Sequence, residues 1–316
     1  MTRRIALVAV LVLAVASTAW AQAYPAKPVE LTVLFGAGSA ADLLARKLAE
    51  GASKDLGQPV TVVNRTGAGG AIGYNYVKGQ AADGHSIVWN SNSVSTAFHA
   101  GNMKIDHTAF SGVAQLTSEP VTVAVKADAP WKDIKELIAH AKAKPGAVRI
   151  GNSGRGSFTH LMAVALENRA GVKFTHVPFG RELAVATVMG DKIEASAQLP
   201  AEIMAQVTGK QVRVLGVIGE QRVPSLPDVP TLKENGIDLT MSLWRGVAVP
   251  KGTPEAVIAR LERAFVAAAR SPEFREFATK MGASVDVRSA RDFDQFIARD
   301  DNDIATLMEQ IGLKKQ

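Results

Sequence analysis

Short runs of β-branched and other apolar residues alternate along the chain with longer stretches in which apolar positions recur every three or four residues. The short runs predict strands and the periodic stretches predict amphipathic helices. The expected strands are VELTVLF, QPVTVVN, HSIVWN, VTVAVKA, AVRIGN, KFTHVPF, IEASAQL, VRVLGVI and WRGVAVP. The expected helices include Ala41–Leu56, Trp131–Lys144, Phe158–Ala170 and Leu183–Met189. This alternation predicts an α/β protein with parallel sheets and helices on both faces.

The first residues have the three parts of a secretory signal peptide. A basic start, MTRR, precedes the apolar run IALVAVLVLAVASTAW, and AQA at residues 21–23 fits an A-x-A cleavage site. We therefore expect residues 1–23 to be a signal peptide that is removed before Tyr24. A membrane anchor is the less favoured interpretation, because the apolar run is shorter than the roughly 20 residues that span a bilayer.

The composition limits where the exported protein can reside and which kinds of site it can contain. The 316 residues include no cysteine, which excludes disulfides, thiolate metal sites and a cysteine nucleophile. A lipid anchor would need a cysteine directly after the cleavage site, so we expect the protein to move freely in the periplasm. The formal net charge is +6 without a run of like charges, so no nucleic-acid partner is expected.

Two extended segments, each followed by a proline-containing turn and a new helix, indicate that the chain crosses between two lobes. They are VTVAVKADAPW near the middle and SLWRGVAVPKGTP near residue 245. If the chain crosses at the first and returns at the second, the C-terminal helices pack on the N-terminal lobe. We predict lobe I from residues 24–121 and 245–316 and lobe II from residues 122–244, with a ligand cleft between them.

A glycine-rich loop follows the first expected strand. Gly36, Gly38 and Ala41 fit the G-x-G-x-x-G/A fingerprint of dinucleotide-binding folds. Such a site also needs an acidic residue about 20 positions later to hold the ribose, whereas Asn64 and Arg65 end the second strand here. A dinucleotide-dependent oxidoreductase that uses the GAGSAA loop therefore stays an alternative rather than the favoured interpretation.

The same loop also reads as an ordinary helix start, with Ser39 as N-cap and Asp42 as its capping partner. Its free N–H groups lie at the positive end of a helix dipole, which favours an anion. A second copy of this arrangement follows another expected strand in RIGNSGRGSFTHL, with Ser157 as N-cap. Two such loops, one in each lobe, suit an elongated ligand with an anionic group at one or both ends.

The sequence offers little support for a catalytic site. Ser153 does not complete a G-x-S-x-G nucleophile motif, because Arg155 stands where the last glycine belongs. The six histidines show no H-E-x-x-H pattern, and His160 is best interpreted as a capping or packing residue. We expect no catalytic residue, metal or cofactor, which leaves an exported hydrolase as a weak further alternative.

Several segments resemble the substrate-binding receptors of tripartite tricarboxylate transporters, the Bug (Bordetella uptake gene) family. The resemblance covers nearly the whole mature chain, and NRTGAGGAIG and PDVPTL are its most specific motifs. It implies a two-lobed periplasmic-binding-protein fold of the type II-like class, a small carboxylate ligand, favoured as a dicarboxylate, and membrane transporter subunits as partners. Because the two loops have no catalytic group of residues between them, we also expect a monomeric receptor without enzymatic activity.

Carried over by position, the resemblance assigns the family's two carboxylate-binding loops to residues 35–42 and 152–159. It also places one strand end in the cleft and an aromatic residue at the return crossing. The residues expected at the ligand are Phe35, Gly36, Gly38, Ser39, Ala40, Ala41, Asp42, Asn90, Ser91, Asn152, Ser153, Gly156, Ser157, Thr159, Arg181, Gln198 and Trp244.

Three departures from the family pattern leave the identity of the carboxylate open. The first loop has Ser39 and single glycines where the family has a proline and paired glycines. Arg181 and Glu182 occupy a loop that is usually rich in small residues, and Gln198 replaces a common aspartate. Arg181 either forms a bidentate contact with a second carboxylate or pairs with Glu182 or solvent.

Overall fold

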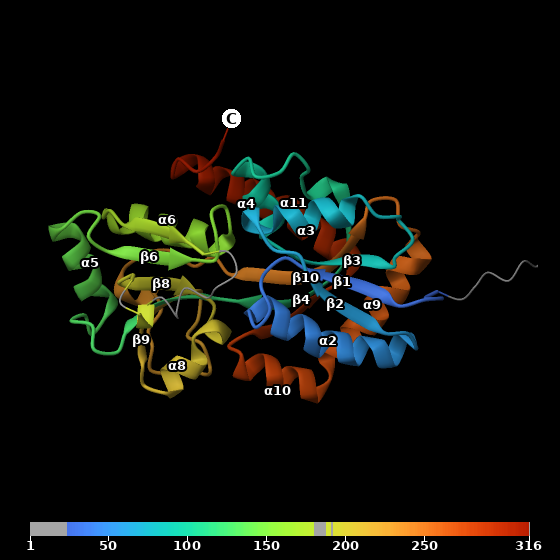
Figure 1. The fold of residues 1–316 in the computed structure, drawn as a ribbon, viewed down its shortest axis with the longest axis horizontal. Helices are drawn as coiled ribbons and strands as arrows, with labels where there is room; N and C mark the ends of the chain where they lie inside the picture. Colours follow the sequence, from blue (N-terminus) through green and yellow to red (C-terminus); the bar gives the residue numbers. More distant parts are fainter. Residues whose placement is uncertain (1–23, 180–187, 191, 316) are drawn as a thin grey trace, which may run out of the picture.

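The computed structural model describes residues 24–179, 188–190 and 192–315 and shows two α/β lobes side by side (Figure 1). The sheet of lobe I contains β1 (Val29–Val33), β2 (Val60–Asn64), β3 (Ser86–Ser91), β4 (Phe110–Glu119), β10 (Leu243–Pro250) and β11 (Ser284–Arg288). Its strand order is β11-β4-β10-β3-β1-β2. The signal peptide predicted for residues 1–23 lies outside the described residues.

Lobe II is built on a second, smaller sheet. Its strands are β5 (Val121–Lys126), β6 (Arg149–Asn152), β7 (Thr175–Pro178), β8 (Ala195–Gln198) and β9 (Val212–Ile218), in the order β7-β6-β8-β5-β9. Its helices include α5 (Ile134–Ala143), α6 (Phe158–Ala170), α8 (Met204–Thr208) and the 3₁₀ turns η3 (Pro200–Glu202) and η4 (Lys233–Asn235). The helix expected over Leu183–Met189 falls largely outside the described residues.

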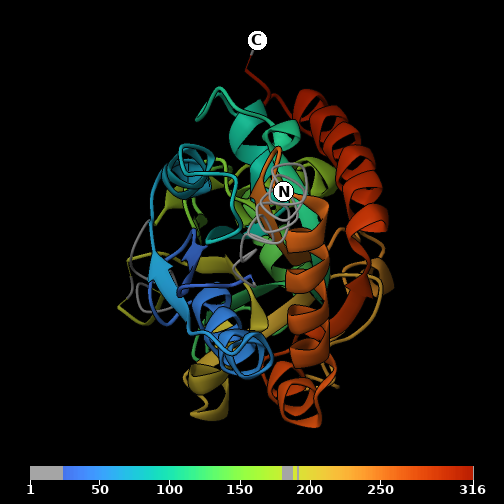
Figure 2. The same cartoon turned by 90° about the vertical axis from the view of Figure 1, so that its right-hand side faces the viewer.

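The sheet of lobe I lies between two layers of helices, as the α/β pattern predicts. The helices are α2 (Ala40–Leu56), α3 (Ala71–Lys78), α4 (Ser93–His99), α9 (Glu255–Arg270), α10 (Pro272–Lys280) and α11 (Ala290–Gln310), with the 3₁₀ turns η1 (Ala68–Gly70) and η2 (His107–Ala109). Successive residues of a strand face opposite sides of its sheet. Trp89 accordingly belongs to the same apolar cluster as Leu44 of α2 and Phe265 of α9, whereas Val88 belongs to the cluster of Phe293 of α11. The end-on view shows α2 in blue and α11 in red on different sides of the lobe (Figure 2).

Two connections join the sheets, and they explain why the sheets are not purely parallel. Only Pro120 separates β4 from β5, and residues 219–242 lead from β9 back to β10. A chain that leaves through β4 and returns through β10 must run in opposite directions in those strands. Accordingly, β10 pairs antiparallel with β3 and β4, and β5 pairs antiparallel with β8 and β9.

The expectation of parallel sheets is therefore wrong for the strands next to the crossings and for β11, and both sheets are mixed. The lobe boundaries after residues 121 and 244 stay a prediction. The change of sheet between Glu119 and Val121 and the start of β10 at Leu243 lie next to them.

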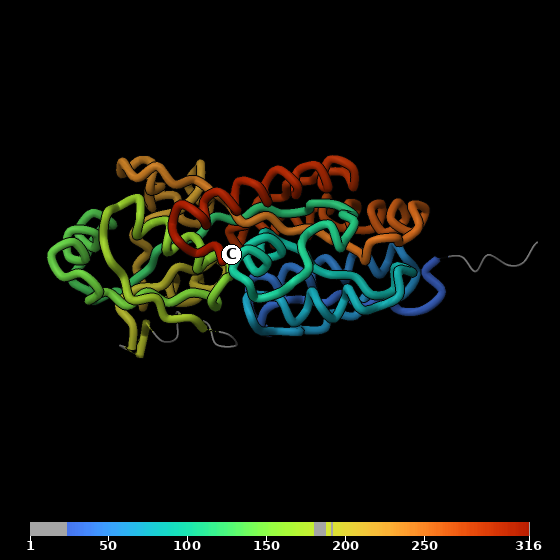
Figure 3. Tube along the Cα trace, turned by 90° about the horizontal axis from the view of Figure 1, so that it is seen from above, coloured from blue at the N-terminus to red at the C-terminus, as the bar shows by residue number. Residues whose placement is uncertain are grey.

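Helix α11 starts on lobe I and extends along the molecule to lobe II (Figure 3). Its last two turns contribute Ile304, Leu307 and Met308 to an apolar cluster that contains Phe158 and Leu161 of α6. The C-terminal helix therefore packs against both lobes. In the described part of the chain, no helix has the length and apolar character needed to cross a membrane.

Candidate functional site

The first loop ends in a helix cap that its sequence predicts. The Ser39 hydroxyl accepts a hydrogen bond from the Asp42 N–H (3.3 Å), and the Asp42 carboxylate accepts one from the Gly38 N–H (2.9 Å). Gly38 has φ +80°, a left-handed conformation that favours glycine. The Asn64 amide donates to Asp42 Oδ1 and to the Phe35 carbonyl, both at 2.9 Å. These bonds fix the loop against β2.

Asp42 is buried and its carboxylate is fully engaged. Burial alone raises the pKa of Asp42, but hydrogen bonds from Arg46, Gly38 and Asn64 together hold that pKa below its usual value. The carboxylate is therefore ionised and holds the loop in place.

The end of β2 offers no acidic residue for a ribose. Asn64 is committed to the first loop, and Arg65 pairs with Glu30 (3.1 Å) and stacks on the ring of Tyr76 (3.5 Å). Asn64 Oδ1 already accepts a hydrogen bond from Arg46 (3.1 Å), and the Arg65 side chain has no acceptor atom, so neither replaces the acidic residue of a dinucleotide ribose site. The fingerprint glycines alone do not support a dinucleotide site.

The second loop has a similar architecture, and Ser157 is the predicted N-cap of α6. Its hydroxyl accepts from the His160 N–H (3.3 Å) and lies 3.1 Å from the Thr159 hydroxyl. Thr159 Oγ1 also accepts from the Ser153 N–H (2.9 Å). The loop therefore places three hydroxyl groups, those of Ser153, Ser157 and Thr159, at the start of one helix.

His160 supports this loop from behind. Its Nδ1 accepts a hydrogen bond from the Gly156 N–H (3.2 Å), and its ring packs edge-on against His176. Burial lowers the pKa of His160 to about 4, with further lowering by the charges of His176 and Arg155. His160 is neutral at physiological pH and positions the loop, in line with a capping or packing role.

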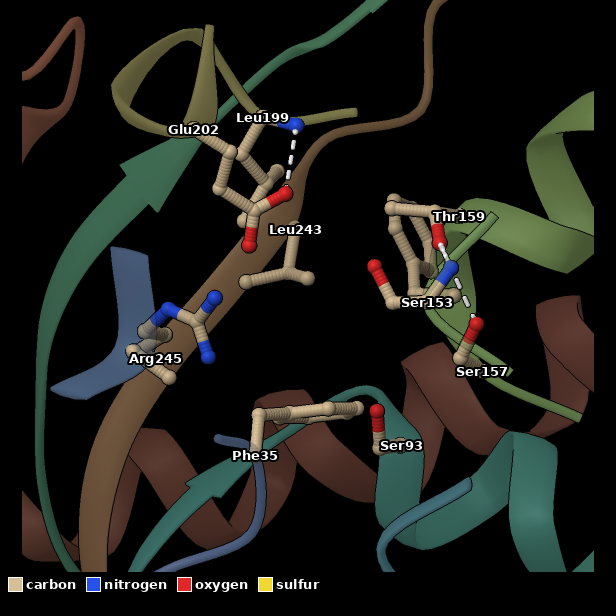
Figure 4. A pocket seen from close by; sticks show the side chains of 11 residues that line it. Phe35, Ser93, Ser153, Ser157, Thr159, Leu199, Glu202, Leu243 and Arg245 are labelled. Atoms are coloured by element: carbon tan, nitrogen blue, oxygen red, sulfur yellow. Dashed lines mark hydrogen bonds between the residues drawn. The ribbon is translucent and has the colours of Figure 1, made fainter. Parts of the chain in front are cut away.

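Residues of both loops meet at a small cavity of about 10 Å³ between the lobes (Figure 4). This is room for about one water molecule, so a ligand fits between the loops only if the lobes move apart. Its lining residues are Phe35, Ala41, Ser93, Ser153, Ser157, Phe158, Thr159, Leu199, Glu202, Leu243 and Arg245.

Five of the residues predicted at the ligand line this cavity, namely Phe35, Ala41, Ser153, Ser157 and Thr159. The others in the described part of the chain lie next to the lining or behind it, and their contact with a ligand stays a prediction. They are Gly36, Gly38, Ser39, Ala40, Asp42, Asn90, Ser91, Asn152, Gly156, Gln198 and Trp244. Arg181, the predicted partner of a second carboxylate, lies outside the described residues.

Two of these residues have well-defined partners away from the cavity. Asn90 accepts a hydrogen bond from the Tyr74 hydroxyl (2.7 Å) in the core of lobe I. Trp244 donates from its indole N–H to Asp300 (2.7 Å) and packs edge-on against Phe293. Because side chains alternate along β10, it is the next residue, Arg245, that lines the cavity.

Three polar residues at the cavity were not predicted from the sequence: Ser93, Glu202 and Arg245. The Ser93 hydroxyl is buried without a hydrogen-bond partner among the described residues, and it points into the cavity (Figure 4). Arg245 Nε donates to Glu119 Oε1 (2.6 Å), and both side chains are almost completely buried. No local sequence motif marks these three residues. They come from β10, η3 and the start of α4, and they meet only in the folded protein.

Glu202 faces Arg245 from the other lobe. One of its oxygens accepts from the Leu199 N–H (3.3 Å). Burial raises the pKa of Glu202 to about 7, the charge of Arg245 opposes this rise, and the charge of Glu119 adds to it. One end of the cavity therefore carries a buried guanidinium and a carboxyl group that titrates near neutral pH.

The cavity thus combines four hydroxyl groups, a guanidinium, and two helix N-termini next to it. Such groups donate hydrogen bonds to anions. No group of three or more metal-ligating side chains occurs among residues 24–179, 188–190 and 192–315. The same cavity also has the carboxyl groups of Glu202, in its lining, and of Glu119, paired with Arg245.

Two α/β lobes joined by two crossing connections, with a polar cavity between them, define a solute-binding protein of the periplasmic-binding-protein fold. The chain belongs to the family described as "Tripartite tricarboxylate transporter family receptor", whose model matches residues 44–313. The family predicted from the sequence is therefore confirmed. Receptors of this family are periplasmic solute-binding proteins.

Relatives support the same assignment over nearly the full length. The chain is 32% identical to the UPF0065 protein in the gbd 5′ region of Cupriavidus necator over 304 residues, which cover 96% of this chain and 93% of the relative. The structure of the periplasmic binding protein BugD superposes with a TM-score of 0.87 at 30% identity, covering 93% of this chain and all of BugD.

Two structural neighbours were solved with dicarboxylates. MatC from Rhodopseudomonas palustris with bound malate has a TM-score of 0.85 at 26% identity and covers 90% of this chain and 99% of MatC. A second R. palustris protein, solved with adipate, has a TM-score of 0.85 at 25% identity. The match covers 92% of this chain and 98% of the R. palustris chain.

Proposed function

We propose that this protein is a monomeric periplasmic receptor that binds a small dicarboxylate between its lobes and delivers it, unchanged, to a tripartite tricarboxylate-type membrane transporter. The observation that carries the proposal is the interlobe cavity with hydroxyl groups at one end and Arg245 at the other. The malate and adipate seen in two neighbours support this class of ligand.

In the proposed complex, one carboxylate lies at the N-terminus of α6, where it accepts hydrogen bonds from Ser153, Ser157 and Thr159. The other carboxylate lies at Arg245, and the Ser93 hydroxyl donates to the ligand between them. Phe35, Phe158 and Leu243 enclose the carbon chain. The two anionic ends of the ligand then meet donors from different lobes, which makes binding depend on both lobes.

Calorimetry with a panel of mono-, di- and tricarboxylates tests this function, and Ser157→Ala tests the site. Loss of a donor to a buried carboxylate weakens binding by about 1–3 kcal/mol. Because Ser157 is also an N-cap, its loss destabilises α6 by about 1 kcal/mol. Ser271→Ala is the matched control, since Ser271 caps α10 through the Phe274 N–H (3.2 Å) and does not line the cavity.

We expect dicarboxylates to bind, Ser157→Ala to weaken that binding and Ser271→Ala to leave it unchanged. Mass spectrometry of the recovered ligand should find the same acid that was added. If no carboxylate of the panel binds, the proposed function is wrong. If Ser157→Ala and Ser271→Ala bind alike, the dicarboxylate binds elsewhere.

A further inference from the structure

The Arg245 end of the cavity contains more acid than base. Arg245 on β10 forms its ion pair with Glu119 on β4, and the two charges neutralise each other. Glu202 on η3 lines the same end of the cavity and is only 7% exposed. Among the residues that the structure describes, the pair therefore leaves a second, buried carboxyl group without an ion pair of its own.

The groups around Glu202 come from four elements. Arg245 and Glu119 act on it through their charges, and the Leu199 and Ala40 N–H groups donate hydrogen bonds to it. In the first turn of α2, the acidic residue is Asp42, whose carboxylate is occupied by Gly38, Asn64 and Arg46. The helix that follows η3, α8 (Met204–Thr208), has no titratable side chain.

A ligand carboxylate at Arg245 changes this balance. It brings a further negative charge next to Glu202 in a place that water does not screen. Two carboxylates that share a site cannot both ionise without a large cost, so one of them binds a proton. A protonated Glu202 also gains an O–H group, which can donate to the ligand carboxylate that Arg245 holds.

We propose that Glu202 is a specificity-determining residue that takes up one proton when a dicarboxylate binds and donates it in a hydrogen bond to the ligand carboxylate at Arg245. The proton comes from solvent, and no covalent bond changes. This inference rests on the proposed function and adds to it that binding of the dianion is coupled to pH. The pKa of about 7 for Glu202 places the transition in the physiological range.

The test uses malate and adipate as dicarboxylates and butyrate as a monocarboxylate, with calorimetry between pH 6 and 8, where both diacids are largely dianions. Uptake of one proton by a group with a pKa near 7 weakens binding about tenfold between pH 6 and 8. Repetition in buffers of different ionisation enthalpy counts the protons directly, and we expect about one per diacid at pH 8. Butyrate, if held at the α6 end, should bind without proton uptake.

Glu202→Gln supplies a permanent amide donor in place of the protonated carboxyl group. We expect this variant to bind the diacid with the same affinity at pH 6 and 8 and without proton uptake. Glu220→Gln is the control, because Glu220 is exposed and pairs with Lys233 (3.2 Å) away from the cavity. It should keep the tenfold pH dependence of the unmodified protein.

The outcomes separate the two proposals. Failure of malate, adipate and every other acid of the panel to bind overturns the proposed function, and this inference falls with it. Diacid binding that is independent of pH and of the buffer, in the unmodified protein, overturns the inference alone. The same holds if Glu202→Gln keeps the pH dependence, because another group then carries the proton.

Discussion

At the scale of single residues, Trp244 and Asp300 connect the return crossing to the C-terminal helix. Asp300 Oδ2 accepts hydrogen bonds from the Trp244 indole (2.7 Å) and from the Asn92 amide (3.2 Å). Burial raises the pKa of Asp300 to about 7; these two hydrogen bonds oppose the rise, and the charges of nearby aspartates add to it. The folded protein therefore favours the protonated form of Asp300 more strongly than the unfolded chain does.

This shift predicts how stability depends on pH. A carboxyl group whose folded-state pKa is raised contributes stability that is fully present below its unfolded pKa, about 3.9, and is lost as pH rises towards 7. Asp300→Asn keeps an oxygen for both donors and removes the titration. We expect its free energy of unfolding to fall less between pH 5 and 8 than that of the unmodified protein, by on the order of 1–3 kcal/mol.

Urea unfolding at several pH values measures this difference. Asp228→Asn, which removes an exposed aspartate in lobe II, is the control and should follow the unmodified protein. Parallel loss of stability in Asp300→Asn and the control between pH 5 and 8 would show that Asp300 is not the titrating group.

The residues predicted correctly from sequence are those whose roles are local. Ser39 and Ser157 are N-caps, and a cap is defined by residues within one helical turn. Arg245 and Glu202 lie 43 positions apart in the sequence and share the cavity only because β10 and η3 meet there. Neither has a neighbouring motif, so their role was accessible only from the fold.

At the scale of elements, the NRTGAGGAIG segment forms a contact between the lobes. Gly69 in η1 has φ +68°, and a Cβ added to it would lie 3.0 Å from the Arg155 and Gly156 carbonyl oxygens. Beside it, the Asn102 amide donates to the Ala68 and Arg155 carbonyls at 3.2 and 3.0 Å. The segment therefore rests directly on the second loop when the lobes are closed.

We predict that Gly69→Ala weakens dicarboxylate binding, because the added methyl group keeps η1 from closing against the second loop. Gly57→Ala is the matched control, since Gly57 has φ +70° and no atom within 4 Å of the added Cβ. Both variants place alanine in the left-handed region and lose about 1 kcal/mol of stability. Only Gly69→Ala should lose affinity, by about tenfold, or 1.4 kcal/mol.

Calorimetry with the dicarboxylate that binds best checks this difference. Equal affinities for Gly69→Ala and Gly57→Ala would mean that η1 does not limit closure.

The nine strands expected from apolar runs are all present, and the edge strands β2 and β7 are only partly buried. Strands β4 and β11 were not among them. The sequence of β4 mixes Ser, Gly, Gln and Thr with its apolar residues, although the strand is buried between β10 and β11. The predicted strand directions were also wrong for β5 and β10, which run antiparallel to their neighbours. Their direction follows from the crossing of the chain between the lobes, and no local sequence pattern encodes that crossing.

At the scale of the whole molecule, the structure shows the lobes in contact around a small cavity. Glu202 of lobe II accepts a hydrogen bond from the Ala40 N–H of lobe I, and Asn102 of lobe I donates to Arg155 of lobe II. These contacts join the two lobes next to the cavity. The cavity has room for about one water molecule, so we expect the proposed dicarboxylate to enter by an opening and closing of the lobes about the two crossing connections.

The last prediction follows from this requirement. A ligand shifts a conformational equilibrium only through contacts that differ between the two states, and here the donors for its two carboxylates come from different lobes. We expect small-angle X-ray scattering to show a smaller radius of gyration when a bound dicarboxylate saturates the protein. An acid of the panel that does not bind, at the same concentration, controls for the effect of added salt. If the radius of gyration does not change with saturating ligand, the ligand either contacts one lobe only or binds in a cleft that is already closed. In neither case do the ligand contacts favour closure of the lobes, and the prediction is then wrong.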